Sequence, residues 1–303
     1  MKILITGSTG QLSRELQLAL AGEDKVLALG HKLLDLAEPA QIRQQVRLLR
    51  PDLIINAAAY TGVDPAEQEP ELAFAVNAKG AGILAEAAAE LGAPLIHYST
   101  DYVFDGRKPT PYDEADEPAP LSVYGQSKLA GERAIQAVGG EHLILRTSWV
   151  YSLHGRNFLL TMRRLLQERD SLSVVSDEIG APTWAGTIAA ATAQMVGKLR
   201  TGTGGPWGLY HLTTTGETSW YGFACRIADD LQRQGLLRAR IRPILSADYP
   251  TAARRPLNSR LSSARLQQDW QIQLPDWERA LQQCLGNPHD WPLTGHADIM
   301  HSA

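Results

Sequence analysis

Short apolar runs alternate with longer segments of helical periodicity in the first half of the chain. The apolar runs predict strands at residues 3–5, 26–29, 53–55, 95–98 and 143–145. The segments between them predict helices near residues 12–20, 42–49, 71–91 and 124–137. Strand and helix in strict alternation are typical of a parallel sheet that is covered on both faces. We therefore expect an α/β fold with a doubly wound parallel sheet.

A glycine-containing loop, Gly7-Ser8-Thr9-Gly10, joins the first predicted strand to the first helix. Gly7 permits a tight turn, and Gly10 lets the backbone approach a pyrophosphate. The helix N-terminus adds free N–H groups and a favourable dipole. An ordinary glycine-rich turn is the alternative, but the place after the first strand favours a dinucleotide site of the Rossmann type. Ser13 departs from this pattern, because glycine is usual at the third position.

The end of the second strand bears on the choice of cofactor. An acidic residue there would bind the adenosine ribose of NAD. The chain instead has Gly30, followed by His31 and Lys32. The missing acid and the nearby cation favour the extra phosphate of NADPH. Asp35 lies a little further on and keeps NADH open as the alternative.

The regular alternation ends near residue 150, after which proline, tryptophan and arginine become commoner. We expect a dinucleotide-binding domain over residues 1–150. Residues 151–295 are expected to form mainly a smaller substrate-binding domain with segments that return to the sheet, and residues 296–303 a flexible tail.

Composition excludes several classes of function. The 303 residues are 44% hydrophobic and 20% charged, with a net charge of -4, which is the balance of an ordinary globular protein. No long run of Lys or Arg predicts nucleic-acid binding, and no apolar run suits a membrane partner. Two widely separated cysteines, Cys225 and Cys284, fit a reducing, cytoplasmic setting.

Tyr124 and Lys128 have the spacing that places two side chains on one helical face. A nearby ammonium would lower the pKa of a tyrosine, which then exchanges a proton with a carbonyl oxygen. Many amphipathic helices contain this spacing by chance, so its surroundings matter. Thr100 follows the fourth strand at the edge where ligands bind, and Ala58 follows the third with a side chain small enough for a cofactor to lie flat. The sequence thus predicts a threonine, tyrosine and lysine triad.

Several longer motifs carry a resemblance to a known family. They are Ala57-Ala-Ala-Tyr-Thr61, Ser99-Thr-Asp-Tyr-Val-Phe-Asp-Gly106, Tyr124-Gly-Gln-Ser-Lys-Leu-Ala-Gly-Glu132, Arg146-Thr-Ser-Trp-Val-Tyr151 and Arg255-Pro-Leu-Asn-Ser259. Together they resemble the dTDP-4-dehydrorhamnose reductases, of the extended short-chain dehydrogenase/reductase superfamily. The resemblance extends from Met1 to about residue 285.

The resemblance implies that hydride passes from a nicotinamide to C4 of a dTDP-4-keto-6-deoxysugar, giving dTDP-L-rhamnose. Tyr124 would protonate O4, and Lys128 would tune Tyr124 and bind the nicotinamide ribose. Thr100 and Asp101 would contact the sugar, and Trp149 would pack against its ring. Further positions that match cofactor contacts are Gly10, Gln11, Leu12, Asp35, Leu36, Ala59, Tyr60, Thr61 and Tyr98.

The motif near residue 255 predicts further substrate contacts, at Arg255 and Asn258. Arg254 and Arg255 would suit a diphosphate through bidentate contacts, although a cap or a surface ion pair would use them equally well. Trp149 has a similar alternative as a core aromatic residue.

Magnesium and assembly form a separate expectation. Some members of the family share a magnesium ion across a dimer interface, and Glu15 matches one of its acidic residues. Gly186 stands where another would be, and glycine has no oxygen ligand to offer. We therefore expect no metal site, and a monomer or a weak homodimer held by other surfaces.

Two other functions use the same fold. One is a non-catalytic subunit that regulates methionine adenosyltransferase, and the other is a nucleotide-sugar epimerase or dehydratase. An intact triad argues against the first, and Asp101 as the one extra acid beside the triad argues against a dehydratase. The sequence leaves open the oligomeric state, the final polymer and whether the nucleotide is strictly dTDP.

Overall fold

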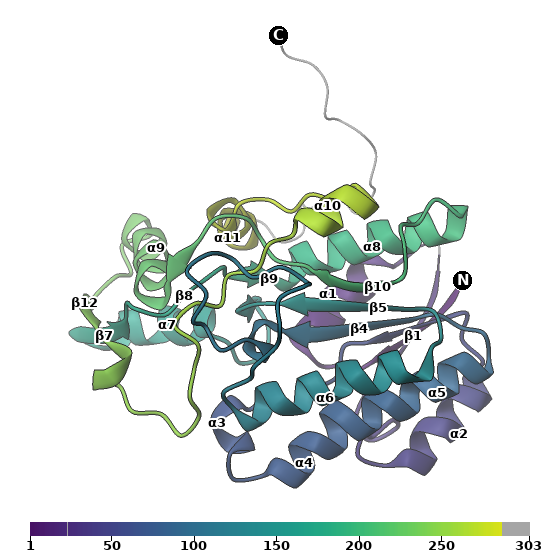
Figure 1. Ribbon diagram of the computed structural model, residues 1–303. Helices are drawn as coiled ribbons and strands as arrows, with labels where there is room; N and C mark the ends of the chain where they lie inside the picture. Colours follow the sequence, from purple (N-terminus) through teal and green to yellow (C-terminus); the bar gives the residue numbers. More distant parts are fainter. Residues whose placement is uncertain (23, 287–303) are drawn as a thin grey trace.

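The computed structural model describes residues 1–22 and 24–286, and a six-stranded parallel sheet lies at its centre (Figure 1). Its strand order is β10-β5-β4-β3-β1-β2, which is the doubly wound order expected from the alternating pattern. The strands are β1 (Lys2–Thr6), β2 (Lys25–Leu29), β3 (Leu53–Asn56), β4 (Leu95–Thr100), β5 (His142–Thr147) and β10 (Gly208–His211). The five predicted strands and the fold class are thereby confirmed.

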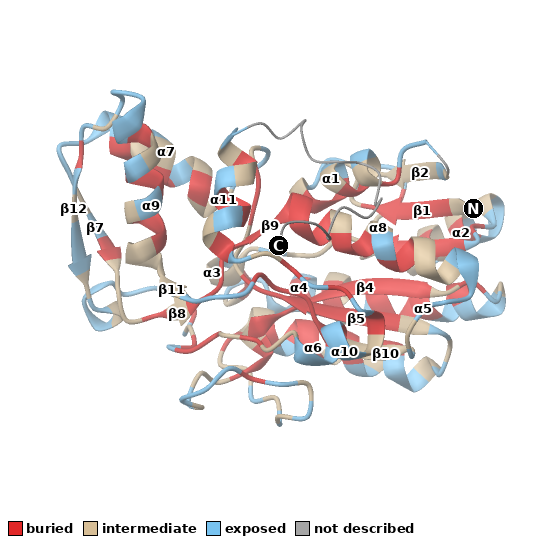
Figure 2. Ribbon diagram, turned by 90° about the horizontal axis from the view of Figure 1, so that it is seen from above, coloured by how far each residue is buried: buried red, intermediate tan, exposed pale blue. Residues whose placement is uncertain are grey.

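Helices cover both faces of this sheet, because apolar strands buried on both faces require it. On one face, α1 (Gln11–Ala19) packs against α8 (Ala185–Thr201). On the other lie α2 (Pro39–Leu49), α5 (Ala81–Glu90) and α6 (Val123–Val138) (Figure 1). Buried side chains form a separate apolar cluster on each face. The strands of the sheet are coloured mostly as buried in Figure 2.

The predicted helix at 71–91 contains a π-helical turn. It runs through α4 (Pro70–Phe74), the π-helical segment η1 (Ala75–Gly80) and α5. The turn lies against α6, where a Cβ on Gly131 would come within 2.1 Å of the carbonyl oxygen of Asn77. Pro70–Glu90 is long and apolar enough to cross a membrane, but 56% of its apolar window is buried inside the protein, as in a core helix.

The second half of the chain builds a smaller unit with its own apolar cluster. It consists of α7 (Phe158–Glu168), β7 (Ser171–Val175), α9 (Trp220–Arg233), β12 (Arg240–Ile244) and α11 (Trp277–Gly286). Two segments of this half belong to the sheet instead, since α8 packs on α1 and β10 pairs with β5. The predicted tail, 296–303, lies outside the described residues.

Short elements connect the two units. They are α3 (Val63–Ala66), the 3₁₀ turns η2 (Asp101–Val103) and η3 (Ser246–Asp248), β6 (Val150–Tyr151), β8 (Ile179–Gly180), β9 (Thr183–Trp184) and β11 (Thr218–Ser219). The helix α10 (Ala264–Trp270) packs against β10 instead, as part of the sheet's apolar cluster. β6 pairs with β9, and β8 with β11. These pairs hold the second unit beside the carboxyl ends of the central strands, where ligands of such sheets bind.

Candidate active site

The loop between β1 and α1 has the geometry of a phosphate-binding turn. Gly7 adopts a φ of 72°, and a Cβ there would lie 3.0 Å from that of Ala58. Gly10 is the N-cap of α1, and no side chain caps the helix. The first N–H groups of α1 therefore suit an anion. Ser13 is fully buried, so its small side chain is accommodated where glycine is usual.

The other predicted cofactor positions surround this loop. The Asp35 carboxylate accepts a hydrogen bond from Ala37 N at 2.9 Å and lies 3.2 Å from His31 Nε2. Leu36 and Leu12 are buried. Gln11 joins the loop to the second unit, since its Nε2 donates to Val150 O at 3.2 Å.

Tyr60 and Tyr98 are held by their neighbours. The backbone of Tyr60 exchanges two hydrogen bonds with the Asn77 side chain, at 2.8 and 3.0 Å. Tyr98 instead turns its ring toward α8, where its hydroxyl meets Thr192 Oγ1 at 2.7 Å. Ala58, Ala59 and Thr61 belong to the loop that follows β3. The predicted cofactor positions thus share one edge of the sheet, except that the side chain of Tyr98 lies in the core.

Tyr124 stands in the first turn of α6, close to the end of β4. Ser122 caps the helix by accepting a hydrogen bond from Gly125 N at 3.2 Å. Gly125 allows close packing, because a Cβ there would lie 2.2 Å from Tyr102 O. Burial raises the pKa of Tyr124 to about 12, opposed by a hydrogen bond with Thr100 and reinforced by the charge of Asp101. The phenol is therefore protonated at neutral pH, as a proton donor must be.

The polar contacts of Lys128 lie on β4. Its Nζ donates to Tyr98 O at 2.7 Å and lies 3.2 Å from His97 Nε2, so the ammonium is directed at β4. The lysine is not among the causes of the Tyr124 shift. Burial lowers the pKa of Lys128 itself to about 8, opposed by Glu132. In this structure burial therefore determines the direction of the Tyr124 pKa shift, and the role of Lys128 beside Tyr124 stays a prediction.

Asp101 is a buried carboxyl group beside the tyrosine. Its Oδ1 accepts a hydrogen bond from Thr100 Oγ1 at 2.9 Å, and its Oδ2 has no partner. Burial raises its pKa to about 7, opposed chiefly by the hydrogen bond from Thr100. An unpartnered buried oxygen is costly and marks a group suited to a ligand.

Trp149 lies at the junction of the two units in a strained conformation. Its φ is 46°, which is unusual for a bulky residue. One face stacks on Trp220 with the ring centroids 3.5 Å apart, and its Nε1 donates to Ser259 Oγ at 3.0 Å. A Cβ on Gly180 would come within 2.5 Å of the ring, which fixes the indole further. Trp149 is thus part of a stacked pair. Because Trp220 covers one face of the indole, the predicted contact with a sugar could use only the opposite face.

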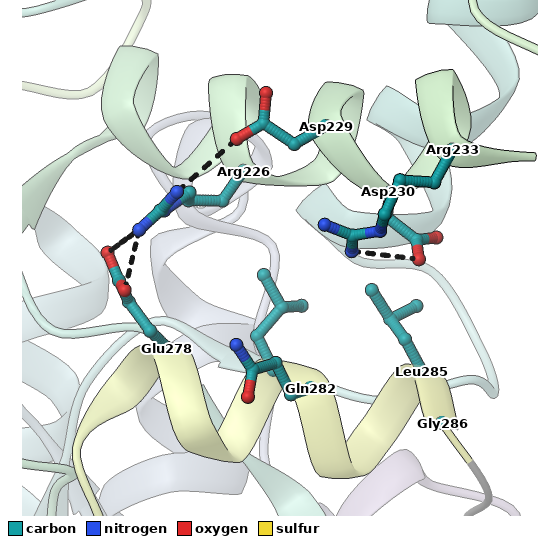
Figure 3. A pocket seen from close by; sticks show the side chains of 9 residues that line it. Arg226, Asp229, Asp230, Arg233, Glu278, Gln282, Leu285 and Gly286 are labelled. Atoms are coloured by element: carbon teal, nitrogen blue, oxygen red, sulfur yellow. Dashed lines mark hydrogen bonds and ion pairs between the residues drawn. The ribbon is translucent and has the colours of Figure 1, made fainter.

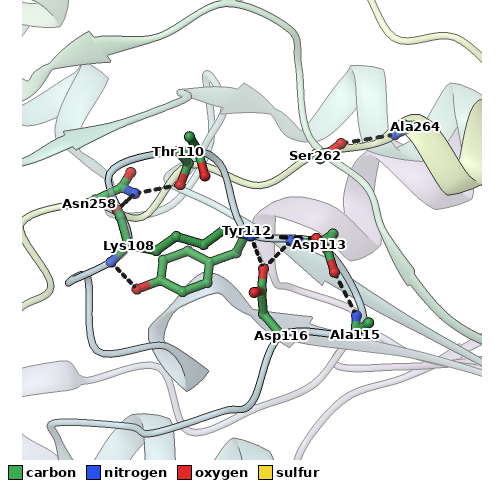
Figure 4. A network of polar contacts seen from close by, with 9 residues as sticks. All are labelled: Lys108, Thr110, Tyr112, Asp113, Ala115, Asp116, Asn258, Ser262 and Ala264. Atoms are coloured by element: carbon green, nitrogen blue, oxygen red, sulfur yellow. Dashed lines mark hydrogen bonds and ion pairs between the residues drawn. The ribbon is translucent and has the colours of Figure 1, made fainter.

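Arg255 takes the ion-pair alternative that the sequence left open, whereas the contacts of Asn258 were not predicted. Arg255 forms a bidentate ion pair with Asp64, at 2.7 and 3.2 Å, instead of pointing freely toward a diphosphate. Asn258 donates to the carbonyl oxygens of Lys108 and Thr110 (Figure 4). Its own oxygen accepts hydrogen bonds from Arg260. Arg254 is exposed. The Asn258 side chain thus holds the loop at Lys108 and Thr110, and its contact with a substrate stays a prediction.

Four residues near the site were missed by the sequence analysis: His97, Glu178, Trp220 and Ser259. Glu178 is buried, which raises its pKa, and it accepts a hydrogen bond from Trp220 Nε1 at 3.0 Å. Their positions depend on contacts between distant segments, so no local spacing could reveal them. His97 lies directly within a predicted strand, and its polar side chain in an apolar run was the available signal.

The positions expected to bear on magnesium are occupied in other ways. A Cβ on Gly186 would lie 2.5 Å from the Trp184 ring, so that place has no room for a carboxylate. Residues 1–22 and 24–286 contain no cluster of three or more acidic, His or Cys side chains that suits a metal.

A pocket of about 230 Å³ lies elsewhere, between α9 and α11 (Figure 3). Its lining is mostly charged and includes Arg226, Asp230 and Arg233. None of the predicted site residues lines it.

Comparison with known proteins agrees with this geometry. The family described as "RmlD substrate binding domain" matches residues 1–289. A dTDP-4-dehydrorhamnose reductase of Burkholderia thailandensis is 44% identical over 292 residues, which cover 94% of this chain and 98% of that relative. One of Escherichia coli K12 is also 44% identical, over 94% of this chain and 97% of the relative.

Solved structures show the same likeness. A dTDP-4-dehydrorhamnose reductase from Bacillus anthracis, in complex with NADP, is 39% identical with a TM-score of 0.84, over 93% of this chain and 98% of that one. Another from Clostridium acetobutylicum is 35% identical with a TM-score of 0.86, over 94% and 99%. The chain therefore belongs to the dTDP-4-dehydrorhamnose reductases, a family of nicotinamide-dependent oxidoreductases with a Rossmann-type fold.

Proposed function

We propose that the chain reduces the C4 carbonyl of dTDP-4-dehydrorhamnose to give dTDP-L-rhamnose, with Tyr124 as the proton donor. One observation carries this assignment: a buried tyrosine with a pKa of about 12 lies beside Thr100 at the carboxyl edge of the sheet. The hydroxyl keeps its proton until a neighbouring oxygen gains negative charge. It then donates that proton to the sugar O4.

The loop of Gly7 and Gly10 and the first turn of α1 suit the pyrophosphate of the cofactor. Bound there, the nicotinamide supplies the hydride. Of the two cofactors, NADPH is the preferred proposal, because Lys32 lies near the end of β2 and the relative from Bacillus anthracis was solved with NADP. NADH remains the alternative through Asp35. The Lys128 ammonium has three N–H donors, of which two are directed at Tyr98 O and His97 Nε2 of β4. The third donates to a ribose hydroxyl of the cofactor in this proposal.

The sugar lies against Thr100, Asp101 and the open face of Trp149 in this proposal. The unpartnered Oδ2 of Asp101 accepts a hydroxyl of the substrate, which removes the cost of burying it. Arg255 acts indirectly, by holding the segment after η3 against Asp64.

The regulatory-subunit and epimerase alternatives lack a comparable observation. Structures of an NAD-bound UDP-glucose 4-epimerase from Thermus thermophilus reach only 20% identity, which shows the fold alone. The test is to add dTDP-4-dehydrorhamnose to the purified protein with NADPH or NADH and follow oxidation at 340 nm, about the nicotinamide absorbance maximum. We expect stoichiometric oxidation, faster with NADPH. No oxidation with either cofactor, together with tight retention of NAD, would favour the epimerase.

We also infer a cytoplasmic setting and a nucleotide sugar as the small-molecule partner. Both follow from the kind of reaction, since reduced nicotinamide cofactors are cytoplasmic reagents.

A further inference from the structure

A buried hydrogen-bond chain runs from Ala58 N to Lys128. Ala58 N donates to Thr6 Oγ1 at 2.9 Å, and Thr6 Oγ1 donates to Asn56 Oδ1 at 2.7 Å. Asn56 Nδ2 lies 2.9 Å from His97 Nδ1, and His97 Nε2 lies 3.2 Å from Lys128 Nζ. The side chains of Thr6, Asn56, His97 and Lys128 are each at most 2% exposed.

The direction of each hydrogen bond in this chain depends on the charge of the lysine. An ammonium ion only donates, so His97 Nε2 must accept from it and the ring proton must lie on Nδ1. Nδ1–H then donates to the oxygen of Asn56, whose nitrogen donates to Thr6, which requires the Asn56 amide to turn over from its orientation in the structure. A neutral amine also accepts, which permits the reverse: the proton on Nε2 and the Asn56 nitrogen toward His97, as the structure has it. The hydroxyl of Thr6 suits both directions, since it donates and accepts.

Few other groups act on Lys128. Glu132 lies one turn further along α6 and is itself paired with Arg146 of β5, at 2.7 Å. Tyr124 lies one turn before it and is protonated. Burial and the lysine charge together hold the pKa of His97 well below its usual range, so the ring stays neutral. His97 therefore serves Lys128 as a neutral acceptor and not as a counter-ion.

We propose that Thr6, Asn56 and His97 form a positioning chain for Lys128, which holds Nε2 as an acceptor for the ammonium and reverses direction when the lysine loses its proton. This inference rests on the proposed role of Lys128. His97 is a positioning residue, because it acts on the reaction only through the lysine. Its hydrogen bond fixes the direction of the Lys128 side chain. Because the ring is neutral, it does not cancel the charge of the lysine.

The direct test observes the His97 ring in the full-length chain by ¹⁵N NMR, with the signal assigned by its loss in His97→Gln. We expect the Nδ1–H tautomer at pH 6.5 and conversion to the Nε2–H tautomer as the pH passes the Lys128 pKa of about 8. In Lys128→Met this conversion should vanish. An Nε2–H tautomer at every pH, or a conversion that survives in Lys128→Met, overturns the proposal.

Kinetics supply the second readout. Removing the acceptor in His97→Leu should lower the lysine pKa, because a charge-assisted hydrogen bond no longer stabilises the ammonium. The alkaline limb of kcat should then move to lower pH by about one unit. His97→Gln keeps an acceptor oxygen at similar reach and should restore the limb.

Thr192→Val is the matched control. It removes the buried hydrogen bond between Thr192 of α8 and the hydroxyl of Tyr98 on β4, the strand that also carries His97. Its pH profile should equal that of the wild type. Equal shifts in His97→Leu and Thr192→Val would show a merely structural role and overturn the proposal. If Lys128→Met keeps the wild-type kcat and pH profile, the proposed role of Lys128 fails. The tautomer measurement then still tests the hydrogen-bond chain of Thr6, Asn56 and His97 independently.

Discussion

Burial controls the protonation of the polar side chains at the carboxyl edge of the sheet. It raises the pKa of Tyr124 to about 12 and of Asp101 to about 7, and it lowers that of Lys128 to about 8. In each case the charged form is disfavoured, because the low-dielectric interior solvates it poorly. At the residue scale, Tyr124 therefore stays protonated at neutral pH, as the proposed proton donor needs to be, and Lys128 loses its proton at a lower pH than a free lysine.

Tyr124→Phe tests the proton donor. The substitution removes the hydroxyl and keeps the ring, so kcat should fall by roughly 10²–10⁴-fold while NADPH affinity changes little. Steady-state kinetics and a cofactor titration measure both. Tyr112→Phe is the control: its buried hydroxyl donates to Asp105 at 2.9 Å in a loop contact, so its loss should leave kcat nearly unchanged. Wild-type turnover in Tyr124→Phe would refute the assignment.

Asp101→Asn tests the buried carboxyl group through stability. A pKa raised from 3.8 to about 7 contributes stability at low pH, which is lost as the pH rises through 7. The variant does not titrate, so its unfolding free energy relative to wild type should improve by roughly 2–3 kcal/mol between pH 5 and pH 8. Denaturant unfolding at the two pH values measures this change. A difference independent of pH would show that Asp101 titrates normally. Activity should fall in either case.

At the scale of elements, α6 is held in place by close backbone contact. Gly131 lies against the carbonyl oxygen of Asn77 in the π-helical turn, and the Asn77 amide donates to Ser127 Oγ at 3.0 Å. Ser127 in turn donates to the carbonyl oxygen of Tyr124 at 2.8 Å. The π-helical turn therefore sets the position of the helix that carries the tyrosine and the lysine, a common place for such turns.

Gly131→Ala should displace α6 from its packing against the π-helical turn. The added methyl group would meet the Asn77 carbonyl at 2.1 Å, and overpacking of this kind costs about 1–3 kcal/mol. We expect lower stability and a lower kcat, because Tyr124 and Lys128 move together. Gly197→Ala is the matched control within α8, where the methyl group meets nothing and should stabilise the helix by up to about 1 kcal/mol. Thermal unfolding and steady-state kinetics of both variants test this prediction. Equal stability and equal kcat in the two variants would contradict the close packing of α6 against the π-helical turn.

At the scale of the whole molecule, the second unit closes over the carboxyl edge through Trp149 and Trp220. We predict that activity needs no added magnesium and that the chain is a monomer, or a dimer held without metal. The reason is that Trp184 fills the space beside Gly186, so a carboxylate has no place there. Chelation with EDTA followed by assay and light scattering tests both parts. Loss of activity or dissociation on chelation would contradict the prediction.

The sequence by itself determined the fold class and the phosphate loop. Apolar runs of strand length form strands wherever helices can cover both faces, so β1 to β5 follow from local pattern. Gly7 and Gly10 could be read directly, because a tight turn before a helix leaves few other residues that fit. The triad positions also follow from local order, since each residue lies directly after a strand or within the first turns of a helix.

Only the tertiary structure decided how these groups are used. The direction of Lys128 toward His97, the pairing of Arg255 with Asp64 and the stacking of Trp149 on Trp220 each join residues far apart in the chain. The pKa values depend on burial, which exists only once the sheet, α6 and the second unit have packed together. Local spacing determines which residues can meet at the sheet edge, whereas packing determines which partner each one takes and which of them keeps its charge.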